Sequence, residues 1–284
     1  MGERVVIENG NGVIRGTLTE PLVPTEAVLV CLHGGPGGNE HGNTGGYDQI
    51  AEMAAGIGYA TLQFSFFGNG DSDGRPEDYS ISSQMIDYDS AIKFVTDRFE
   101  APVHVVGESA GATIAALRWR EDIASYVLLW PAFDLLDTDF RPLISRAALD
   151  TLVVDEVYEI GGVKLGRALA YEVLTYDFSA CFDLPNKPIF LAHGKSDTIV
   201  SYSQSLRALA SAKSQLLFYS HPTADHGFED PAARREVLST LRSWLKELNA
   251  YQNARNRVLV STTCLHFRNV STVARHDPAT TLYD

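Results

Sequence analysis

The stretch Gly107-Glu-Ser-Ala-Gly111 constrains this chain more than any other, because of what surrounds it. An apolar, β-branched run at 103–106 precedes it and an alanine-rich segment at 112–119 follows it. This order predicts a strand, a tight turn and a helix, with Ser109 at the turn. Side chains at positions 107 and 111 would collide in such a turn, which explains the two glycines. The serine hydroxyl is therefore expected to stand clear of the sheet, beside a helix N-terminus that favours developing negative charge.

Strand and helix patterns alternate along most of the chain. An N-terminal hairpin is predicted from two β-branched runs, 5–7 and 13–19, joined by a turn of Asn and Gly. Further strands are predicted at 27–32, 60–66, 103–107, 125–130, 188–192 and 215–219. Helices are predicted near 46–57, 81–99, 110–120, 201–211 and 231–248. The alternation indicates an α/β fold, with a mostly parallel twisted sheet and helices on both faces.

Two further chemically active side chains follow strands downstream of the serine. Asp197 comes after the strand at 188–192, and His226 comes after the strand at 215–219. The carboxyl ends of parallel strands share one edge of the sheet, so Ser109, Asp197 and His226 are expected to meet there. A serine hydroxyl needs a base to become nucleophilic, and the base needs an acid to orient it. Asp225 is a rival acid, but it adjoins His226 and adjacent side chains point apart.

Backbone donors for an oxyanion are expected on two sides of Ser109. The glycine-rich turn at 33–38 follows the strand at 27–32 and can aim an N–H group into the site. The N–H of Ala110, directly after the serine, is the second expected donor.

Together these motifs resemble those of the α/β-hydrolase superfamily, over roughly residues 5 to 248. Within it the chain is similar to the serine-aminopeptidase-like and cinnamoyl (feruloyl) esterase-like branch. The resemblance is carried by His33-Gly34, Phe67-Gly-Asn-Gly-Asp-Ser-Asp-Gly74, Gly107-Glu-Ser-Ala-Gly111, Tyr176-Asp-Phe-Ser179, His193-Gly-Lys-Ser-Asp197 and Ala224-Asp-His226.

The resemblance implies a nucleophile at Ser109, an acid at Asp197 and a base at His226. It implies an oxyanion hole formed by the N–H groups of Gly35 and Ala110, and no cofactor. Two departures leave the fold unchanged and bear on the substrate. Proline iminopeptidases, which share the glycine-rich turn, usually carry tryptophan where this chain has Ala110. The second glycine-rich loop usually reads Gly-His-Gly, and here Asn69 replaces the histidine.

Net charge and cysteine content limit which classes of partner and which cellular compartment are expected. The net charge is −13 and the pI is near 5.0, which argues against nucleic acid and anionic membranes as partners. No apolar run approaches the ~20 residues of a transmembrane helix, and the first residues lack the apolar core of a signal peptide. Three scattered cysteines predict reduced thiols and a cytoplasmic protein. No Cys/His cluster has zinc spacing, so no metal is expected.

The expected organisation is one α/β-hydrolase domain at 1–248 and a C-terminal extension at 249–284. An insertion at about 131–184 breaks the alternation and is expected to cap the site. Candidates for substrate contact in the cap are Asp134, Asp137 and Tyr176. Residues 258–265 are compatible with a strand, but the family fold has ended by then and the segment is left unassigned. The extension is left open as a disordered tail, a packing arm or the contact of a homodimer.

The leading hypothesis is a serine hydrolase that cleaves a carboxylic ester through an acyl-enzyme, with a small-molecule ester or amide as substrate. One alternative is an aminopeptidase or amidase, in which aspartates at 134–139 anchor a free amino group. Another is an acyltransferase or cyclase that uses the same three residues in a biosynthetic pathway. A binding protein without turnover is disfavoured, because a binder has no need of all three residues.

Overall fold

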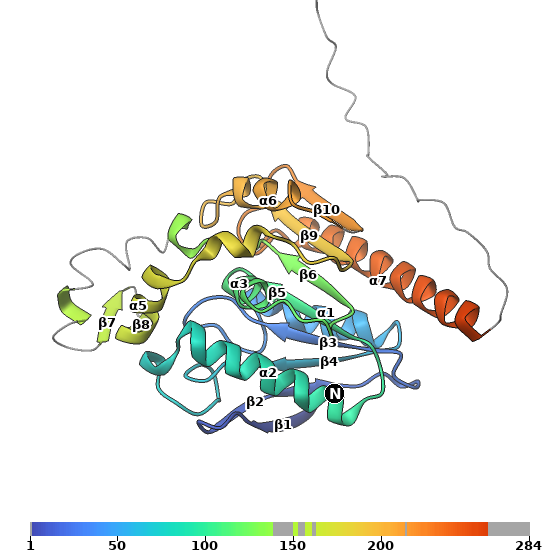
Figure 1. Ribbon diagram of the computed structural model, residues 1–284, viewed down its shortest axis with the longest axis horizontal. Helices are drawn as coiled ribbons and strands as arrows, with labels where there is room; N and C mark the ends of the chain where they lie inside the picture. Colours follow the sequence, from blue (N-terminus) through green and yellow to red (C-terminus); the bar gives the residue numbers. More distant parts are fainter. Residues whose placement is uncertain (1, 139–149, 153–156, 161–162, 214, 261–284) are drawn as a thin grey trace, which may run out of the picture. The chain divides into compact units, whose positions relative to one another are not determined.

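An eight-stranded sheet organises the chain, in the order β1-β2-β4-β3-β5-β6-β9-β10 (Figure 1). The computed structural model describes residues 2–138, 150–152, 157–160, 163–213 and 215–260. The strands are β1 (Glu3–Glu8), β2 (Val13–Thr19), β3 (Ala27–Leu32), β4 (Tyr59–Phe64), β5 (Val103–Glu108), β6 (Ser125–Leu129), β9 (Ile189–Gly194) and β10 (Leu216–His221). Strand β2 pairs antiparallel with β1 and β4, and all other pairs are parallel. The predicted mostly parallel α/β sheet is confirmed.

The inner strands form where the sequence is mostly apolar. Strands β3, β4, β5, β6 and β9 are buried at every position, as strands covered on both faces must be. The first strand, β1, instead alternates exposed and buried residues, because it lies at the edge of the sheet. The six strands predicted after the N-terminal hairpin all occur, and their ends differ from the predicted ends by no more than two residues.

Helices cover both faces of the sheet. Figure 1 shows α2 (Ile81–Arg98) and α3 (Ala110–Leu117) on the near face, with α1 (Gly46–Ala55) and the start of α7 behind the sheet. Helix α6 (Tyr202–Leu209) connects β9 to β10. Helix α2 begins at a capping serine, since the Ser80 hydroxyl accepts from the N–H of Ser83.

Helix α7 (Pro231–Val260) is longer than the sequence predicted. Of the segment 258–265, which the sequence left unassigned, residues 258–260 continue the helix and the remaining residues lie outside the described ones. Residue contacts divide the chain into two compact units, Met1–Trp244 and Leu245–Asp284. The described part of the second unit is the end of α7, and the candidate site described below lies in the first unit. Within the described ranges, every helix is too short or too polar to cross a bilayer.

The insertion at 131–184 contains short elements that the sequence did not predict. They are η3 (Leu135–Asp137), β7 (Val157–Ile160), β8 (Val163–Gly166), α5 (Arg167–Thr175) and η5 (Phe178–Phe182). Strands β7 and β8 form an antiparallel hairpin of their own. Helix α5 is fastened to the start of α2, because Glu172 accepts from the N–H of Ser82 at 3.1 Å and the hydroxyls of Tyr176 and Ser82 are 3.2 Å apart.

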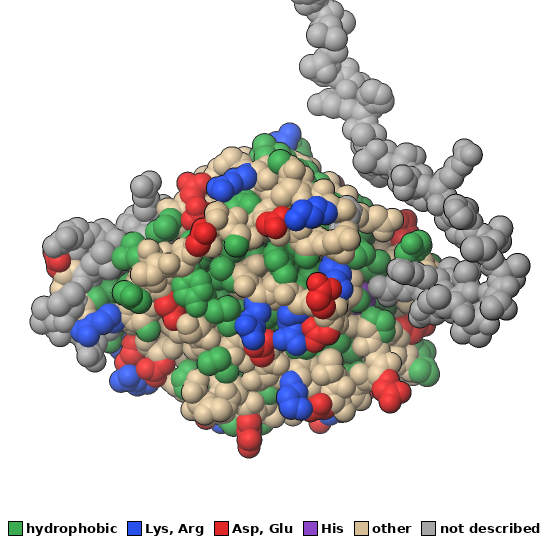
Figure 2. Space-filling model, viewed as in Figure 1, with side chains coloured by type: hydrophobic (Ala, Val, Ile, Leu, Met, Phe, Trp, Pro, Cys, Tyr) green, Lys and Arg blue, Asp and Glu red, His purple; other side chains and the backbone are tan. Residues whose placement is uncertain are grey.

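Surface charge is mixed despite the acidic balance of the chain. On the face in Figure 2, basic and acidic side chains are interspersed rather than gathered into a patch of one sign. Arg118 and Arg120, for example, both pair with Asp89. Pairs of this exposed kind contribute little to stability.

Candidate active site

Ser109 lies at the turn between β5 and α3, in a strained backbone conformation. Its φ is 51° and its ψ is −121°, a region that side chains other than glycine seldom adopt. The turn is crowded, as the sequence predicted. A Cβ atom at position 111 would lie 2.0 Å from the carbonyl oxygen of Leu32, and one at position 107 would lie 2.8 Å from the backbone of Ala112. Glycine is therefore required on both sides of the serine.

The structure brings together the three residues that the sequence placed at one edge of the sheet. The hydroxyl oxygen of Ser109 is 3.0 Å from Nε2 of His226, and Nδ1 of His226 is 2.8 Å from Oδ2 of Asp197. The carboxylate can only accept, so Nδ1 carries the proton and Nε2 is free to accept the serine proton. Asp225 does not take the place of Asp197, because its carboxylate accepts from the N–H of Glu229.

Asp197 is held ionised by a full set of hydrogen bonds. Its Oδ1 accepts from the N–H groups of Ile199 and Val200, each at 2.9 Å. Its Oδ2 also lies 3.1 Å from Nε2 of His193. Burial alone would raise the pKa of Asp197, but hydrogen bonds from His193 and His226 hold that pKa well below its usual range. The carboxylate therefore remains negative while it faces the imidazole.

Within residues 34–38, the glycine-rich loop leaves one backbone donor unpaired. Its other N–H groups have partners: Gly34 donates to Glu108, Gly37 donates to Asn69, and Gly38 donates to the carbonyl of Gly35. Position 36 is proline and has no N–H. All residues of this loop are described, and the N–H of Gly35 is the donor that has no partner within the protein. Gly35 and Ala110, at the first position of α3, both line the space next to Ser109.

Two polar side chains fix this loop from beneath. His33 is buried; its Nδ1 is 2.7 Å from the carbonyl of Gly34, and its Nε2 accepts from the N–H of Phe66 at 3.0 Å. Burial lowers the pKa of His33 to about 4, so the ring is neutral near pH 7. Asn69, which departs from the usual histidine of the second glycine-rich loop, accepts from the N–H of Gly37 at 2.8 Å. The asparagine thus still anchors the loop.

Glu108, between the glycine and the serine of the motif, has a structural role that the sequence analysis missed. Its side chain is buried, and Oε1 accepts from the N–H groups of Gly34 and Asn43 at 3.3 and 2.9 Å. Burial raises the pKa of Glu108 to about 7, and the two N–H donors together with the charges of His226 and Arg234 limit the rise. A glutamate at the end of a fully buried strand was the available signal, because such residues are seldom buried without a partner.

Replacement of Glu108 by glutamine is expected to change how stability depends on pH. A carboxyl whose pKa is higher in the folded protein binds more protons there than in the unfolded chain. Stability is therefore lost as pH rises between its ordinary pKa of 4.5 and about 7. Glutamine keeps an oxygen that can accept from both N–H groups, but it does not titrate. The variant is therefore spared this pH-dependent loss of folding free energy, which the difference between the two pKa values puts at up to about 3 kcal/mol. The melting temperature of Glu108→Gln minus that of wild type should therefore be larger at pH 8.5 than at pH 5.

The exposed Glu52 on α1 supplies the matched control for this measurement. Glu52→Gln should show the same difference from wild type at both pH values. Other titrating groups, Asp197 included, are common to all three proteins and cancel in the comparison. A difference between Glu108→Gln and wild type that does not change with pH would contradict the expectation.

Arg234 on α7 ties the histidine loop to the loop that follows the glycine-rich turn. Its side chain is buried, with Nε 3.0 Å from the carbonyl of Phe228 and Nη2 bonded to the carbonyl of Gly227. Its Nη1 reaches the carbonyls of Asn43 and Thr44 at 3.1 and 3.2 Å. One guanidinium therefore spans residues on both sides of the candidate site. Its place within a helix gave no sequence signal of this role.

Arg234→Met is expected to lower kcat/KM about 100-fold, the scale of a misplacement of about 1 Å between reacting groups. Methionine keeps an apolar stem but donates to none of the four carbonyls. Arg235→Met, at the exposed neighbouring position, is the control and should leave kcat/KM unchanged. Rates should be measured with a p-nitrophenyl ester at a temperature where circular dichroism shows both variants folded. Equal rates for the two variants would count against a positioning role for Arg234.

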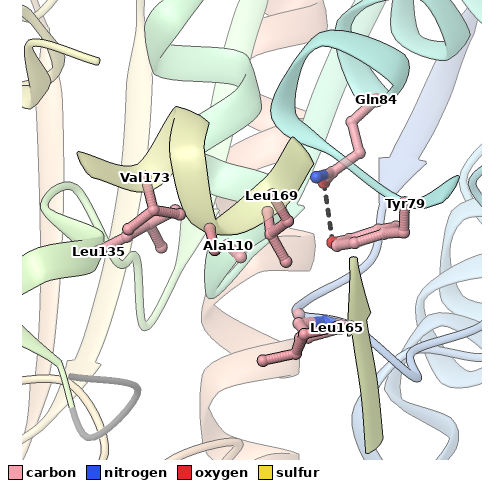
Figure 3. A pocket seen from close by; sticks show the side chains of 10 residues that line it. Tyr79, Gln84, Ala110, Leu135, Leu165, Leu169 and Val173 are labelled. Atoms are coloured by element: carbon pink, nitrogen blue, oxygen red, sulfur yellow. Dashed lines mark hydrogen bonds between the residues drawn. The ribbon is translucent and has the colours of Figure 1, made fainter. Parts of the chain in front are cut away.

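Two hollows meet at the candidate site. An open cleft of about 440 Å³ contains Ser109 and His226 together with the glycine-rich loop. A second pocket of about 50 Å³ lies beneath α5 and is almost wholly apolar (Figure 3). Gly35 and Pro36 line both, so the loop with the unpaired N–H separates the two hollows.

The cap residues named from sequence lie outside the lining of both hollows. Asp134 accepts from the N–H of Leu136 at the start of η3, and Tyr176 contacts Ser82. Asp137 bonds Gln204 through its backbone carbonyl. The cap residues that do line the apolar pocket are Leu135, Leu165, Leu169, Ala170 and Val173. The spacing of Leu169, Ala170 and Val173 along α5 reads equally well as ordinary core packing, so the sequence could not single them out.

Comparisons with known proteins bear on the family and the fold. Residues 23–156 match the sequence model of the family described as "Serine aminopeptidase, S33", and residues 150–250 match that of the prolyl oligopeptidase family. Human mitochondrial palmitoyl-protein thioesterase ABHD10 is 23% identical over 223 residues, which are 72% of this chain and 69% of that protein. An uncharacterised Mycobacterium tuberculosis protein is 25% identical over 252 residues, which cover 87% and 80% of the two chains.

Solved structures show the same fold. Est1E from Butyrivibrio proteoclasticus, solved with ferulic acid bound, superposes with a TM-score of 0.74 at 20% identity. The match covers 87% of this chain and 99% of that one. With its eight-stranded sheet, its helices and the serine turn between β5 and α3, the chain is an α/β-hydrolase. The match to the serine aminopeptidase model and the likeness to Est1E support the serine-aminopeptidase-like and feruloyl-esterase-like branch that the motifs predicted.

Proposed function

We propose that this protein is a serine hydrolase that cleaves a carboxylic ester through an acyl-enzyme. The observation that carries the proposal is the unbroken chain of hydrogen bonds from Ser109 through His226 to Asp197. A buried, ionised carboxylate at one end and a serine hydroxyl at the other are what base-assisted nucleophilic attack requires. The unpaired N–H of Gly35, beside the serine, supports the same reading.

The proposed reaction has two halves. Ser109 attacks the ester carbonyl as its proton passes to Nε2 of His226, and the carbonyl oxygen becomes an oxyanion that the N–H groups of Gly35 and Ala110 stabilise. The carbon–oxygen bond to the alcohol then breaks, and His226 returns the proton to the departing alcohol. Water attacks the acylated serine with His226 again as base, which releases the carboxylic acid and restores the serine. Asp197 orients the imidazole and stabilises its cation throughout.

The same steps would cleave a thioester, as the name of the human relative suggests, or an amide, as the name of the matching family suggests. Acyl transfer to a nucleophile other than water needs no change in these residues. The ester is preferred over the amide because the pocket beneath α5 is apolar. It offers no charged partner, among its described lining residues, to the free amino group that an aminopeptidase substrate carries.

A fluorophosphonate probe and p-nitrophenyl acetate together test the proposal. The probe is expected to modify Ser109, identified by mass spectrometry of the labelled peptide, and to abolish hydrolysis of the ester in proportion to labelling. Pre-treatment with a slowly hydrolysed ester should protect Ser109 from the probe. Labelling at another residue, or full activity in labelled protein, would overturn the assignment of Ser109 as nucleophile.

A further inference from the structure

We infer that the apolar pocket beneath α5 binds the acyl group of the substrate, and that the open cleft binds an uncharged, hydroxyl-bearing leaving group. The inference rests on the proposed function, because it takes Ser109 as the nucleophile and His226 as the proton donor. Each half of the substrate is assigned to one hollow, and the residues that line that hollow indicate the chemical class of that half.

The assignment of the halves follows from where the proton goes. His226 must hand its proton to the leaving group, so that group lies in the hollow that His226 lines, which is the open cleft. The carbonyl oxygen faces the N–H groups of Gly35 and Ala110. The remaining substituent of the carbonyl carbon is the acyl chain. It lies in the hollow that Gly35 and Ala110 both line, which is the pocket beneath α5.

The lining of the acyl pocket selects a compact apolar group. Figure 3 shows Leu169 and Val173 extending from α5 and Leu165 from β8, around a space next to Ala110. The end of the pocket is closed by Tyr79, whose hydroxyl donates to Oε1 of Gln84 at 2.9 Å.

The size and polarity of this space exclude two kinds of acyl group. Both side chains of the closing pair, Tyr79 and Gln84, are buried, and they leave free a volume of about 50 Å³. A charged amino group placed there would lose its hydration without a counter-charge, at high cost. A long acyl chain would meet the Tyr79–Gln84 pair.

The open cleft offers hydrogen bonds and negative charge. Asn39, Thr44 and Glu229 line it with exposed side chains, beside the backbone of the glycine-rich loop. An amide, a hydroxyl and a carboxylate can each bond to an alcohol hydroxyl. The carboxylate of Glu229, together with a net charge of −13, repels a phosphate-bearing leaving group. A polyol or sugar alcohol suits this lining.

A series of p-nitrophenyl esters tests the acyl half. For wild type, kcat/KM should rise by about fourfold per added methylene from acetyl to butanoyl, the gain from burying each one, and should fall again for dodecanoyl. Ala170→Phe should narrow the pocket and bring the butanoyl-to-acetyl ratio close to one. Ala168→Phe, the same change at an exposed position of α5, should keep the wild-type ratio. Val173→Ala enlarges the same pocket and should shift the preferred acyl group towards a longer chain. This second variant still tests the acyl assignment if Ala170→Phe fails to fold.

A matched pair of alcohols tests the leaving-group half. The butanoyl esters of glycerol and of glycerol 3-phosphate differ only in the phosphate. Wild type should prefer the uncharged ester at least tenfold in kcat/KM at low salt. Glu229→Lys should reduce that preference several-fold, whereas Glu52→Lys, a charge reversal on α1 away from the cleft, should not.

The outcomes separate this inference from the proposed function. If Ser109 is labelled and p-nitrophenyl acetate is hydrolysed, but dodecanoyl is the best acyl group or the phosphate makes no difference, then the substrate assignment is wrong and the mechanism stands. If Ser109 is not labelled and no ester is hydrolysed, then the proposed function itself fails.

Discussion

Ser109→Ala should lower kcat for p-nitrophenyl acetate by about 10⁶-fold, the scale seen when the nucleophile of a serine hydrolase is removed. Alanine keeps the Cβ atom and so accepts the strained turn, where φ is 51°, at about the same cost as serine. The hydroxyl oxygen is lost, and with it the atom 3.0 Å from His226. Far-ultraviolet circular dichroism and the melting temperature should match those of wild type.

The control for this variant is Ser243→Ala. Ser243 is exposed on α7 and bonds only to the preceding turn of its own helix in the structure. Its replacement should leave both the rate and the fluorophosphonate labelling unchanged. Retention of more than a few per cent of wild-type kcat by Ser109→Ala, in protein free of contaminating esterase, would remove the serine from the mechanism.

Asp197→Asn should lower kcat by about 10⁴-fold. An asparagine can present its NH₂ group to Nδ1 of His226, and the ring would then carry its proton on Nε2, where it cannot accept the proton of Ser109. Asp225→Asn is the matched control, because Asp225 bonds to the backbone of Glu229 rather than to the imidazole. That variant should lose no more than a few-fold. Similar losses in the two variants would mean that the acid has been misassigned.

The same aspartate should make the protein sensitive to acid. A carboxyl whose folded-state pKa lies below its unfolded value contributes stability above the unfolded pKa and loses it as pH falls through the folded one. For Asp197 the loss should therefore begin near its ordinary value of 3.8 and continue below it. In Asp197→Asn this part of the acid denaturation should be absent when melting temperatures are compared between pH 5 and pH 3.

Local sequence determines where the strands form, and the edge at which parallel strands end determines where much of the site lies. The runs that became β3, β5 and β9 are mostly apolar and are buried at every position, which is typical of strands covered on both faces. Because these strands are parallel, the residues just after them meet at one edge. That geometric rule was enough to bring Ser109 and Asp197 together, without knowledge of any other contact.

The parts that were missed depend on contacts between distant segments. Glu108 bonds to Asn43, and Arg234 spans Asn43 and Gly227, so neither role has a local pattern. The hairpin of β7 and β8 is a different case, because Gly161-Gly162 between its strands is a local signal of a two-residue turn that the sequence analysis did not use. At the end of α7, the β-branched residues at 258 and 260 were compatible with a strand, but the helix continues through them.

The guanidinium of Arg234 also has a consequence for how the chain folds. It contacts Asn43 across 191 residues of sequence, and His226 meets Ser109 across 117. Contacts that close such long loops are slow to form, because the chain must lose more entropy before they contribute. During refolding from denaturant, secondary structure should therefore recover first and the proposed hydrolysis of p-nitrophenyl acetate last. Activity, rather than ellipticity, is the signal that reports completion of the native state.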